Sequence, residues 1–307
     1  MRSNIRLICL GLLILATTGC ESTRWNFLKR DPANDVPAKP GAAPTVVNLV
    51  AYLNENAKRV NSVRFDDLSV DVTVNAGTIN SQTFGLGGTL FAEKPRNFRL
   101  KASVVSKDEA DIGSNAQEFW FWIARNPEPR QYYCTYRDLD EGRVQMMPLP
   151  IQPEWVMETL GLANYGPADK YQLELDKDGK TLRLIEKARS PSGQPVRKVI
   201  VMNRKEADAR AGQPQVTAYL LLDDATGQEV CSAHITAVKV FNGVVLPSKL
   251  ELRMPAQKMK MAMKMDRVTV NSALPSTAFV RPQMTGIEPF NLATGRVEAV
   301  QRTQGIR

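Results

Sequence analysis

The segment DLSVDVTV, residues 67–74, decides the fold class of this chain. Its apolar side chains fall on every second position, which is the period of a β-strand with one buried face. One face carries Leu68, Val70, Val72 and Val74, and the other carries Asp67, Ser69, Asp71 and Thr73. The same alternation recurs in QTFGLGGTLFA (82–92), in NFRLKASV (97–104) and in later runs. The sequence therefore predicts a mainly β protein with about 11 strands.

Short turn signals join these predicted strands. Asp178-Gly179 and Asn242-Gly243 each lie between two strand-like runs, and both dipeptides tolerate the positive φ angles of tight hairpins. Because most of the strands follow one another without a helix between them, we expect an antiparallel, meandering sheet. The run QEFWFWIA, residues 117–124, is apolar on both faces and is expected to form a central strand covered on each side.

Two segments have the period of a helix instead. The first begins after Thr45, a good N-cap residue, and continues to about Val60 with one apolar stripe. The second, QPEWVMETLGLANYG, covers residues 152–166, and its Pro153 suits a first helical turn. Trp155 and Leu160 are on its apolar face, so we expect this helix to pack as a lid over the concave side of the sheet.

The N-terminus has the pattern of a secretory signal peptide. Arg2 and Arg6 precede an apolar stretch that is too short to span a bilayer, and small residues follow up to Cys20. This ending resembles the lipobox of bacterial lipoproteins, in which the Cys becomes the acylated N-terminus. We expect a signal peptide over residues 1–19, lipid attachment (palmitate or a similar acyl chain) at Cys20, and a flexible tether over 20–44. The segment 281–307 is expected to be an extended or disordered tail.

Charge and composition limit the possible partners. The net charge is +8, and the basic residues are scattered rather than clustered. This favours weak attraction to anionic lipid headgroups over nucleic-acid binding. We therefore expect the membrane as a partner through acylated Cys20, and no nucleic acid.

The residues that carry chemistry are few. His234 is the single histidine, so the sequence holds no two-histidine metal motif and no obvious triad. We expect no catalytic residues, no metal, no cofactor and no enzymatic activity. Apart from Cys20, the cysteines of the mature chain are Cys134 and Cys231. These two could form a disulfide with each other, but two buried free thiols are the favoured expectation.

A stretch of the N-terminal half resembles a known superfamily. Within GTLFAEKPRNFRLKASV (88–104) and ADIGSNAQEFWFWIARNPEPRQYY (110–133), the residues that carry the resemblance are Gly88, Leu90, Phe91, Lys94, Pro95, Phe98, Gly113, Trp120, Phe121 and Trp122. Their order looks like that of the periplasmic lipoprotein carrier and the outer-membrane lipoprotein receptor. The resemblance covers about residues 45–135, and beyond them only the strand alternation supports it.

The resemblance implies a fold and a binding function. The fold is a curved antiparallel half-barrel, here residues 45–280, with an N-terminal helix and a lid helix over an apolar cavity. Lys94 stands where the carrier has an Arg that contacts the lid, and Lys lacks the planar fork of Arg, which puts a carrier-type lock in doubt. The acylated Cys tilts the chain toward the receptor-like branch or an uncharacterised lipoprotein branch.

The segment KMKMAMKMDRVTV, residues 258–270, places four methionines on one strand face. Unbranched, polarizable thioethers adapt to ligands of variable shape, such as acyl chains. They could equally fill an irregular core, and Cu(I) binding is a third interpretation. The expected cavity and lid residues are Phe84, Leu86, Phe98, Leu100, Trp120, Trp122, Trp155, Leu160, Met259, Met261, Met263 and Met265. The apolar parity changes after Asp266, which predicts a β-bulge there.

These observations lead to two hypotheses about function. The first is a periplasm-facing cell-envelope lipoprotein that binds an acyl chain or another hydrophobic ligand, with a role in lipoprotein or lipid transfer. The second is a structural or sensory lipoprotein whose cavity is filled and which acts through a protein partner. Glu21 follows Cys20 where an Asp would favour inner-membrane retention, so the outer membrane is the favoured location.

Overall fold

Thr45 and Asn48 start the helix that opens the described part of the chain. In the computed structural model, which describes residues 44–126, 128–144, 153–190 and 193–298, the two residues form a reciprocal capping box. Helix α1 (Val46–Lys58) buries Leu49, Val50 and Leu53, as its apolar stripe predicts. The expected signal peptide, Cys20 and nearly all of the expected tether (20–43) lie outside the described residues.

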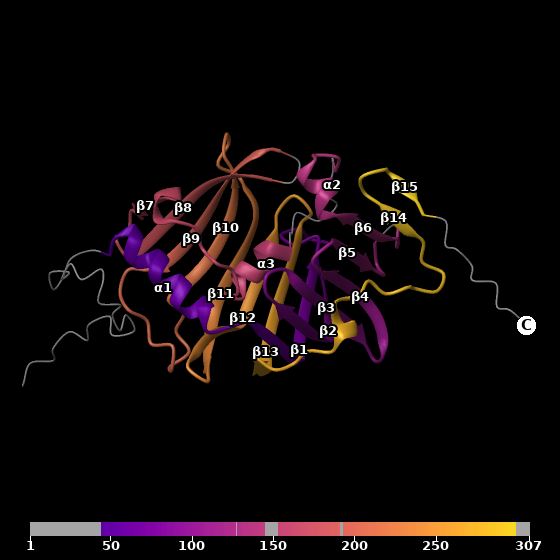
Figure 1. Ribbon diagram of the computed structural model, residues 1–307, viewed down its shortest axis with the longest axis horizontal. Coiled ribbons are helices and arrows are strands. Elements are labelled where there is room, and N and C mark those ends of the chain that lie inside the picture. The colour runs from indigo at the N-terminus through magenta and orange to yellow at the C-terminus, as the bar shows by residue number, and fades with distance from the viewer. Residues whose placement is uncertain (1–43, 127, 145–152, 191–192, 299–307) are drawn as a thin grey trace, which may run out of the picture. The chain divides into compact units, whose positions relative to one another are not determined.

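A single sheet of 15 strands dominates the described residues (Figure 1). The strands are β1 Ser62–Val74, β2 Gln82–Glu93, β3 Asn97–Val104, β4 Lys107–Ser114, β5 Glu118–Ile123, β6 Gln131–Thr135, β7 Tyr171–Leu175, β8 Thr181–Arg189, β9 Pro195–Asn203, β10 Val216–Asp223, β11 Glu229–Phe241, β12 Val244–Met254, β13 Met259–Val270, β14 Pro289–Asn291 and β15 Arg296–Val297. They pair in the order β15-β14-β6-β5-β4-β3-β2-β1-β13-β12-β11-β10-β9-β8-β7.

This sheet is open, because β15 and β7 end it without pairing to each other. The mainly β class and the antiparallel meander are as predicted, except that β14 pairs with β6 in parallel. The strand count of about 11 was too low. The alternation of β4 is hidden by buried Glu109 and Asp111, and β14 and β15 are too short for a periodic signal.

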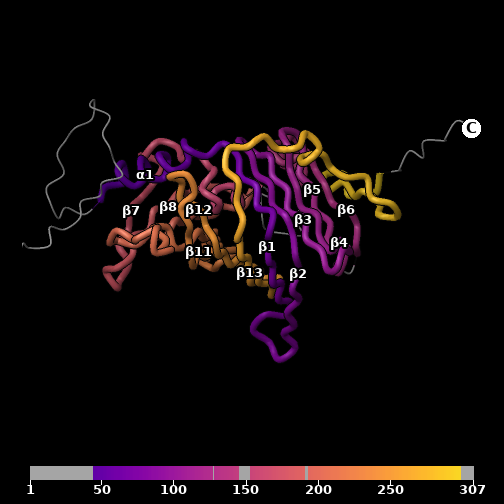
Figure 2. The backbone as a smooth tube through the Cα atoms, turned by 90° about the horizontal axis from the view of Figure 1, so that it is seen from below, coloured from indigo at the N-terminus to yellow at the C-terminus, as the bar shows by residue number. Residues whose placement is uncertain are grey.

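The longest hairpin of the N-terminal half is formed by β1 and β2. Their pairing shifts register near Asp67, and Asp266 is passed over in the pairing of β1 with β13, so the bulge expected there is confirmed. Figure 2 shows this hairpin projecting beyond its neighbours. Ile79, in the loop between the two strands, is fully exposed.

Two more helices interrupt the strands. Helix α2 (Tyr136–Asp140) follows β6 and begins at a second capping box formed by Thr135 and Asp138. Helix α3 (Pro153–Thr159) is the helix predicted over residues 152–166, although it is shorter than the prediction. Figure 1 shows α1 and α3 in front of the same side of the sheet. We call this side the helix face and the other side the opposite face.

The segment after β13 crosses the opposite face and then joins the sheet. Arg99 donates hydrogen bonds to the carbonyls of Ala278 and Val280, in and after the short helix η3 (Ser276–Phe279). Gln131 donates to the Pro282 carbonyl, and β14 then pairs with β6. We call residues 272–298 the C-terminal strap. Part of the segment expected to be an extended or disordered tail is therefore sheet, held by buried side chains that lie far away in the sequence.

Candidate functional site

A continuous apolar surface crosses the middle of the helix face. Met263 lies between Val70 of β1 and Leu250 of β12, and Met261 lies between Val72 and Leu252. Met265 pairs with Leu68 and is fully buried, whereas Met259 at the end of the row is only half-buried. The four methionines, Met259, Met261, Met263 and Met265, thus share one strand face with apolar neighbours on both sides. We call them the Met row.

Strand pairing places other predicted residues on the same face. Phe84 pairs with Val72 and Leu86 pairs with Val70, so both lie on the same face as the Met row, with β1 between them and β13. Phe98 and Leu100 follow on β3, opposite Ala92 and Leu90, and both are buried. Phe84 is partly covered, because the Arg125 guanidinium lies 4.3 Å from its ring centroid.

Trp120 and Trp122 do not belong to this group. In the ladder of β4 and β5, Ile112 pairs with Phe121 while Gly113 pairs with Trp120. Ile112 shares the face of Leu100, so the two tryptophans point to the opposite face. There the Trp120 indole donates a hydrogen bond of 3.0 Å to Asp111, which also holds Arg99 at 2.7 Å. The structure therefore separates these two expected cavity residues from the other ten.

Helix α3 lies over the helix face and is held at both ends by ion pairs. Near its start, Glu154 pairs with Arg96 in the β2–β3 turn at 3.7 Å. Near its end, Glu158 pairs with Lys198 of β9 at 3.8 Å. On a flat sheet, six inter-strand steps would separate β2 from β9 by about 29 Å. Arg96 and Lys198 nevertheless contact Glu154 and Glu158, which are only about 6 Å apart along the helix axis. The sheet must therefore curve towards α3.

The apolar side of α3 is buried beneath it. Trp155, Val156 and Leu160, which the sequence placed on this side, are 5%, 6% and 1% exposed. Thr159 is also buried, and its hydroxyl donates a hydrogen bond to the Val156 carbonyl. The expected lid residue Trp155 is thus on α3, and Leu160 follows directly after it; both are buried.

Polar groups gather where α3 ends. Tyr165 and Tyr219 share a hydrogen bond of 3.0 Å between their hydroxyls, and Asn54 of α1 binds the backbone of Tyr165 in both directions. Burial raises the pKa of Glu158 above its ordinary range, Lys198 opposes this shift, and Glu186 adds to it. Burial likewise raises the pKa of Tyr165 and Tyr219. No sequence pattern predicts this cluster, because its members come from separate elements.

The described residues enclose a small cavity between the helices and the sheet. A cavity of about 50 Å³ is lined by Tyr52 and Asn56 of α1, by Gly161 after α3, and by side chains of β10 to β12. Sites that bind small molecules usually enclose about 300 Å³ or more. Among the described residues, this cavity is therefore too small to hold an acyl chain.

Lys94 contacts α1 and not α3. Its ammonium group donates a hydrogen bond to the Ala57 carbonyl in the last turn of α1, where the helix dipole favours a cation. Burial lowers the pKa of Lys94. The residue that the resemblance assigned to a lid contact therefore ties the N-terminal helix to the β2–β3 turn.

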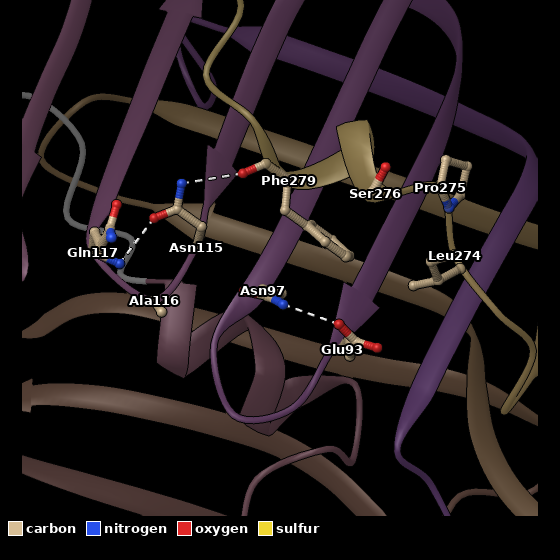
Figure 3. Close-up of a pocket in the computed structure, with 9 residues that line it drawn as sticks. All are labelled: Glu93, Asn97, Asn115, Ala116, Gln117, Leu274, Pro275, Ser276 and Phe279. Atoms are coloured by element: carbon tan, nitrogen blue, oxygen red, sulfur yellow. Dashed lines mark hydrogen bonds between the residues drawn. The ribbon is translucent and has the colours of Figure 1, made fainter.

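A larger pocket lies where the C-terminal strap meets the β2–β3 and β4–β5 turns. Its volume is about 330 Å³, and Glu93, Asn97, Asn115 and Gln117 form one wall with Phe279 opposite them (Figure 3). Asn97 donates to Glu93 at 3.0 Å, and Asn115 donates to the Phe279 carbonyl at 3.1 Å. This pocket is partly polar and lies apart from the Met row.

His234 takes part in a hydrogen-bonded group without the order of a catalytic triad. Ser232 donates to Glu229 at 2.6 Å, and its oxygen lies 3.0 Å from His234 Nε2. In a triad the histidine lies between the serine and the acid, whereas here the serine is in the middle. Ser232 is also fully buried. Burial, and then Arg253, lower the pKa of His234.

The two described cysteines, Cys134 and Cys231, are buried and do not form the disulfide, as the sequence favoured. Burial raises the pKa of both Cys134 and Cys231 to about 12. Within the described ranges, no group of three or more His, Cys, Asp or Glu side chains could hold a metal ion. Among the helices that the structure describes, none is long and apolar enough to cross a membrane.

No family model and no curated protein matches the sequence. Solved structures do resemble the fold. A DUF1329 family protein from Desulfovibrio piger has a TM-score of 0.47 at 9% identity, covering 76% of this chain and 95% of its own. A LolA superfamily protein from Nitrosomonas europaea has a TM-score of 0.44 at 11% identity, covering 76% and 97%.

A third neighbour is an outer membrane lipoprotein-sorting protein domain from Vibrio parahaemolyticus. Its TM-score is 0.44 at 9% identity, and the match covers 75% of this chain and 94% of that one.

Proposed function

We propose that this protein is a cell-envelope lipoprotein that binds an acyl chain or another hydrophobic ligand on the helix face. The ligand would lie along the Met row after α3 has moved away from it. Acylated Cys20 would hold the protein on the periplasmic side of a membrane, with the outer membrane favoured over the inner. Transfer of lipid or of a lipoprotein between membranes is the role that such a site would serve.

One observation carries the proposal: a short helix covers an apolar surface that spans several strands. Residues Pro153–Thr159 form fewer than two full turns. Isolated helices of this length are unstable in water, so α3 depends on its contacts with the sheet. A hydrophobic ligand of similar shape can replace those contacts and keep the apolar side chains of the helix face out of water.

The methionines favour a ligand of variable shape. A row built from Met adapts its side-chain torsions at low cost, whereas branched side chains hold fixed shapes. The neighbouring strands supply Leu and Val, so the Met row is the adaptable part of an otherwise stiff surface. Acyl chains of different length and unsaturation present this kind of variability.

The small cavity favours a second candidate function. Because the described cavity between α1, Thr159 and β10 to β12 holds only about 50 Å³, the protein could keep α3 in place permanently and act through a protein partner. In this alternative the Met row is a plain core. The two candidates differ in whether the purified protein takes up a hydrophobic ligand.

Native mass spectrometry distinguishes them. We expect the protein purified from its membrane to carry bound lipid, or to take up a fatty acid after delipidation. Met259→Lys should abolish uptake, because an unpaired charge in an apolar site is costly, and half-buried Met259 tolerates the change better than the buried methionines. Lys258→Met, next to it in the β12–β13 turn, is the control. A delipidated wild-type protein that binds no lipid at any concentration would favour the second candidate.

Fractionation tests the anchor separately. Cys20→Ser is expected to release the protein from the membrane, because the acyl chains supply most of the membrane affinity. If the variant still sediments with membranes at high salt, acylation at Cys20 is not what holds it there.

A further inference from the structure

Helix α3 has the chemistry of an amphiphile with a charged head. Trp155, Val156 and Leu160 form an apolar body that is at least 94% buried. At its far end, Glu158 places a carboxylate within 3.8 Å of the Lys198 ammonium group. The Glu158 side chain is only 12% exposed, so this carboxylate is largely removed from water.

The strand pairing of β9 places Lys198 on the helix face, where it can contact an anionic group. It pairs with Glu186 of β8 and lies two residues from Ile200, which is opposite Tyr219 on the helix face. Two carboxylates therefore lie near Lys198: Glu158 from above, on α3, and Glu186 beside it, on β8. The ion pair within 4 Å is the one with Glu158.

Departure of α3 takes Glu158 away from Lys198 and so removes one partner of this ion pair. A ligand that only replaces the apolar body leaves Lys198 with Glu186 as its remaining neighbour and leaves the place of the Glu158 carboxylate unfilled. Breaking a partly buried ion pair by removing one partner is unfavourable, because the remaining charge has lost its compensation. A ligand with its own anion restores the pair that α3 provides.

Resting on the function proposed above, we infer that the helix face selects amphiphiles with a single anionic head, such as a fatty acid carboxylate or an alkyl phosphate. The acyl chain lies over the Met row, and the head takes the place of the Glu158 carboxylate at Lys198. In the closed form, α3 is thus a built-in substitute for the ligand. Neutral lipids of the same chain length bind more weakly because they leave Lys198 without this partner.

Calorimetric titration with a matched set of twelve-carbon probes tests the inference. Dodecanoate and dodecyl phosphate carry an anion, and dodecan-1-ol is neutral. We expect the purified protein to bind the two anions at least tenfold more tightly than the alcohol. Lys198→Met should reduce this preference to less than twofold, and it should not weaken binding of the alcohol, because it also removes the ion pair that holds the end of α3.

Two further variants test whether the preference for anionic probes depends on charges on the helix face. Glu186→Gln removes the carboxylate that would repel an incoming anion, so it should increase the preference. Lys187→Met makes the same charge change one position from Glu186, on the opposite face, where Lys187 pairs with Arg197. This control should behave like the wild type.

The outcomes separate the inference from the function on which it rests. If no probe binds, the hydrophobic-ligand function itself is wrong. If the alcohol and the anions bind equally well to the wild type, the function stands but the anionic selectivity is wrong. A preference that persists in Lys198→Met while Lys187→Met abolishes it would also overturn the assignment, because the responsible cation would lie on the opposite face.

Discussion

The indole ring of Trp120 lies directly against Gly113 on the neighbouring strand, so closely that a methyl group on Gly113 would overlap it. Gly113 and Trp120 are opposite each other in the ladder of β4 and β5, on the face away from α3. Two of the ten residues that carry the superfamily resemblance thus form a packing pair on the face that the C-terminal strap crosses. Their role is to fill the opposite face.

Gly113→Ala should therefore destabilise the fold. Overpacking a filled site typically costs about 1–3 kcal/mol, because side chains or backbone must shift. Gly87→Ala is the matched control, since a methyl group there meets nothing within 4 Å. Urea denaturation should show a large decrease in the free energy of unfolding for Gly113→Ala and almost no decrease for Gly87→Ala. Equal stability of the two would mean that Trp120 is not packed as described.

The Met row should tolerate a change of shape better than a change of charge. Met261→Leu and Met263→Leu keep the side-chain volume, so each should lower the free energy of unfolding by less than ~1.5 kcal/mol. Denaturation of the double variant measures this. The same variant should bind a narrower range of acyl chains, because Leu is stiffer than Met. A loss of Cu(I) affinity with unchanged lipid binding would instead support the copper hypothesis.

Lys94→Met should loosen the attachment of α1. The variant loses a hydrogen bond from a cation to the Ala57 carbonyl, and we expect a cost of about 1 kcal/mol in the free energy of unfolding. Lys101→Met removes a more exposed ion pair with Asp108, whose atoms are 4.0 Å apart, and should change stability by less than ~0.5 kcal/mol. Equal effects of the two changes would contradict a specific role for Lys94.

Glu158→Gln should change how stability depends on pH. Burial raises the folded-state pKa of Glu158 above its ordinary value of 4.5, so the folded protein holds this proton more tightly than the unfolded chain does. The resulting stabilisation is complete below pH 4.5 and is lost as the pH rises through the folded-state pKa. Stability of the wild type relative to Glu158→Gln should thus fall as the pH rises from about 4. A difference that is constant across this range would show that Glu158 is not desolvated.

Cys134 and Cys231 should be unreactive in the folded protein. Both are at most 1% exposed, and a pKa of about 12 leaves almost no thiolate at pH 8. A thiol reagent such as DTNB should modify them only after urea unfolding. Fast modification of the native protein at either cysteine would show that the covering side chains open readily.

The local pattern of the chain determined most of the fold. Alternation of apolar side chains located the main strands, and Thr45 and Pro153 located the starts of α1 and α3, because these signals depend on residues a few positions apart. The Met row and its apolar neighbours were also recognisable, since strand periodicity alone puts them on one face. The signal for β4 was lost because its buried carboxylates look like surface residues until Arg99 and Trp120 are placed beside Asp111.

Only the tertiary structure decided which surfaces meet. Strand pairing put Trp120 and Trp122 on the face away from Phe98 and Leu100. The alternation within QEFWFWIA could not predict this, because side chains on both of its faces are apolar. The contact between Glu158 and Lys198 joins residues 40 positions apart on a helix and a strand, and neither shows a pattern that names the other. By itself the sequence fixes periodicity and local caps through short-range sterics and hydrogen bonds. Long-range neighbours, and with them the candidate site, follow from the register and curvature of the whole sheet.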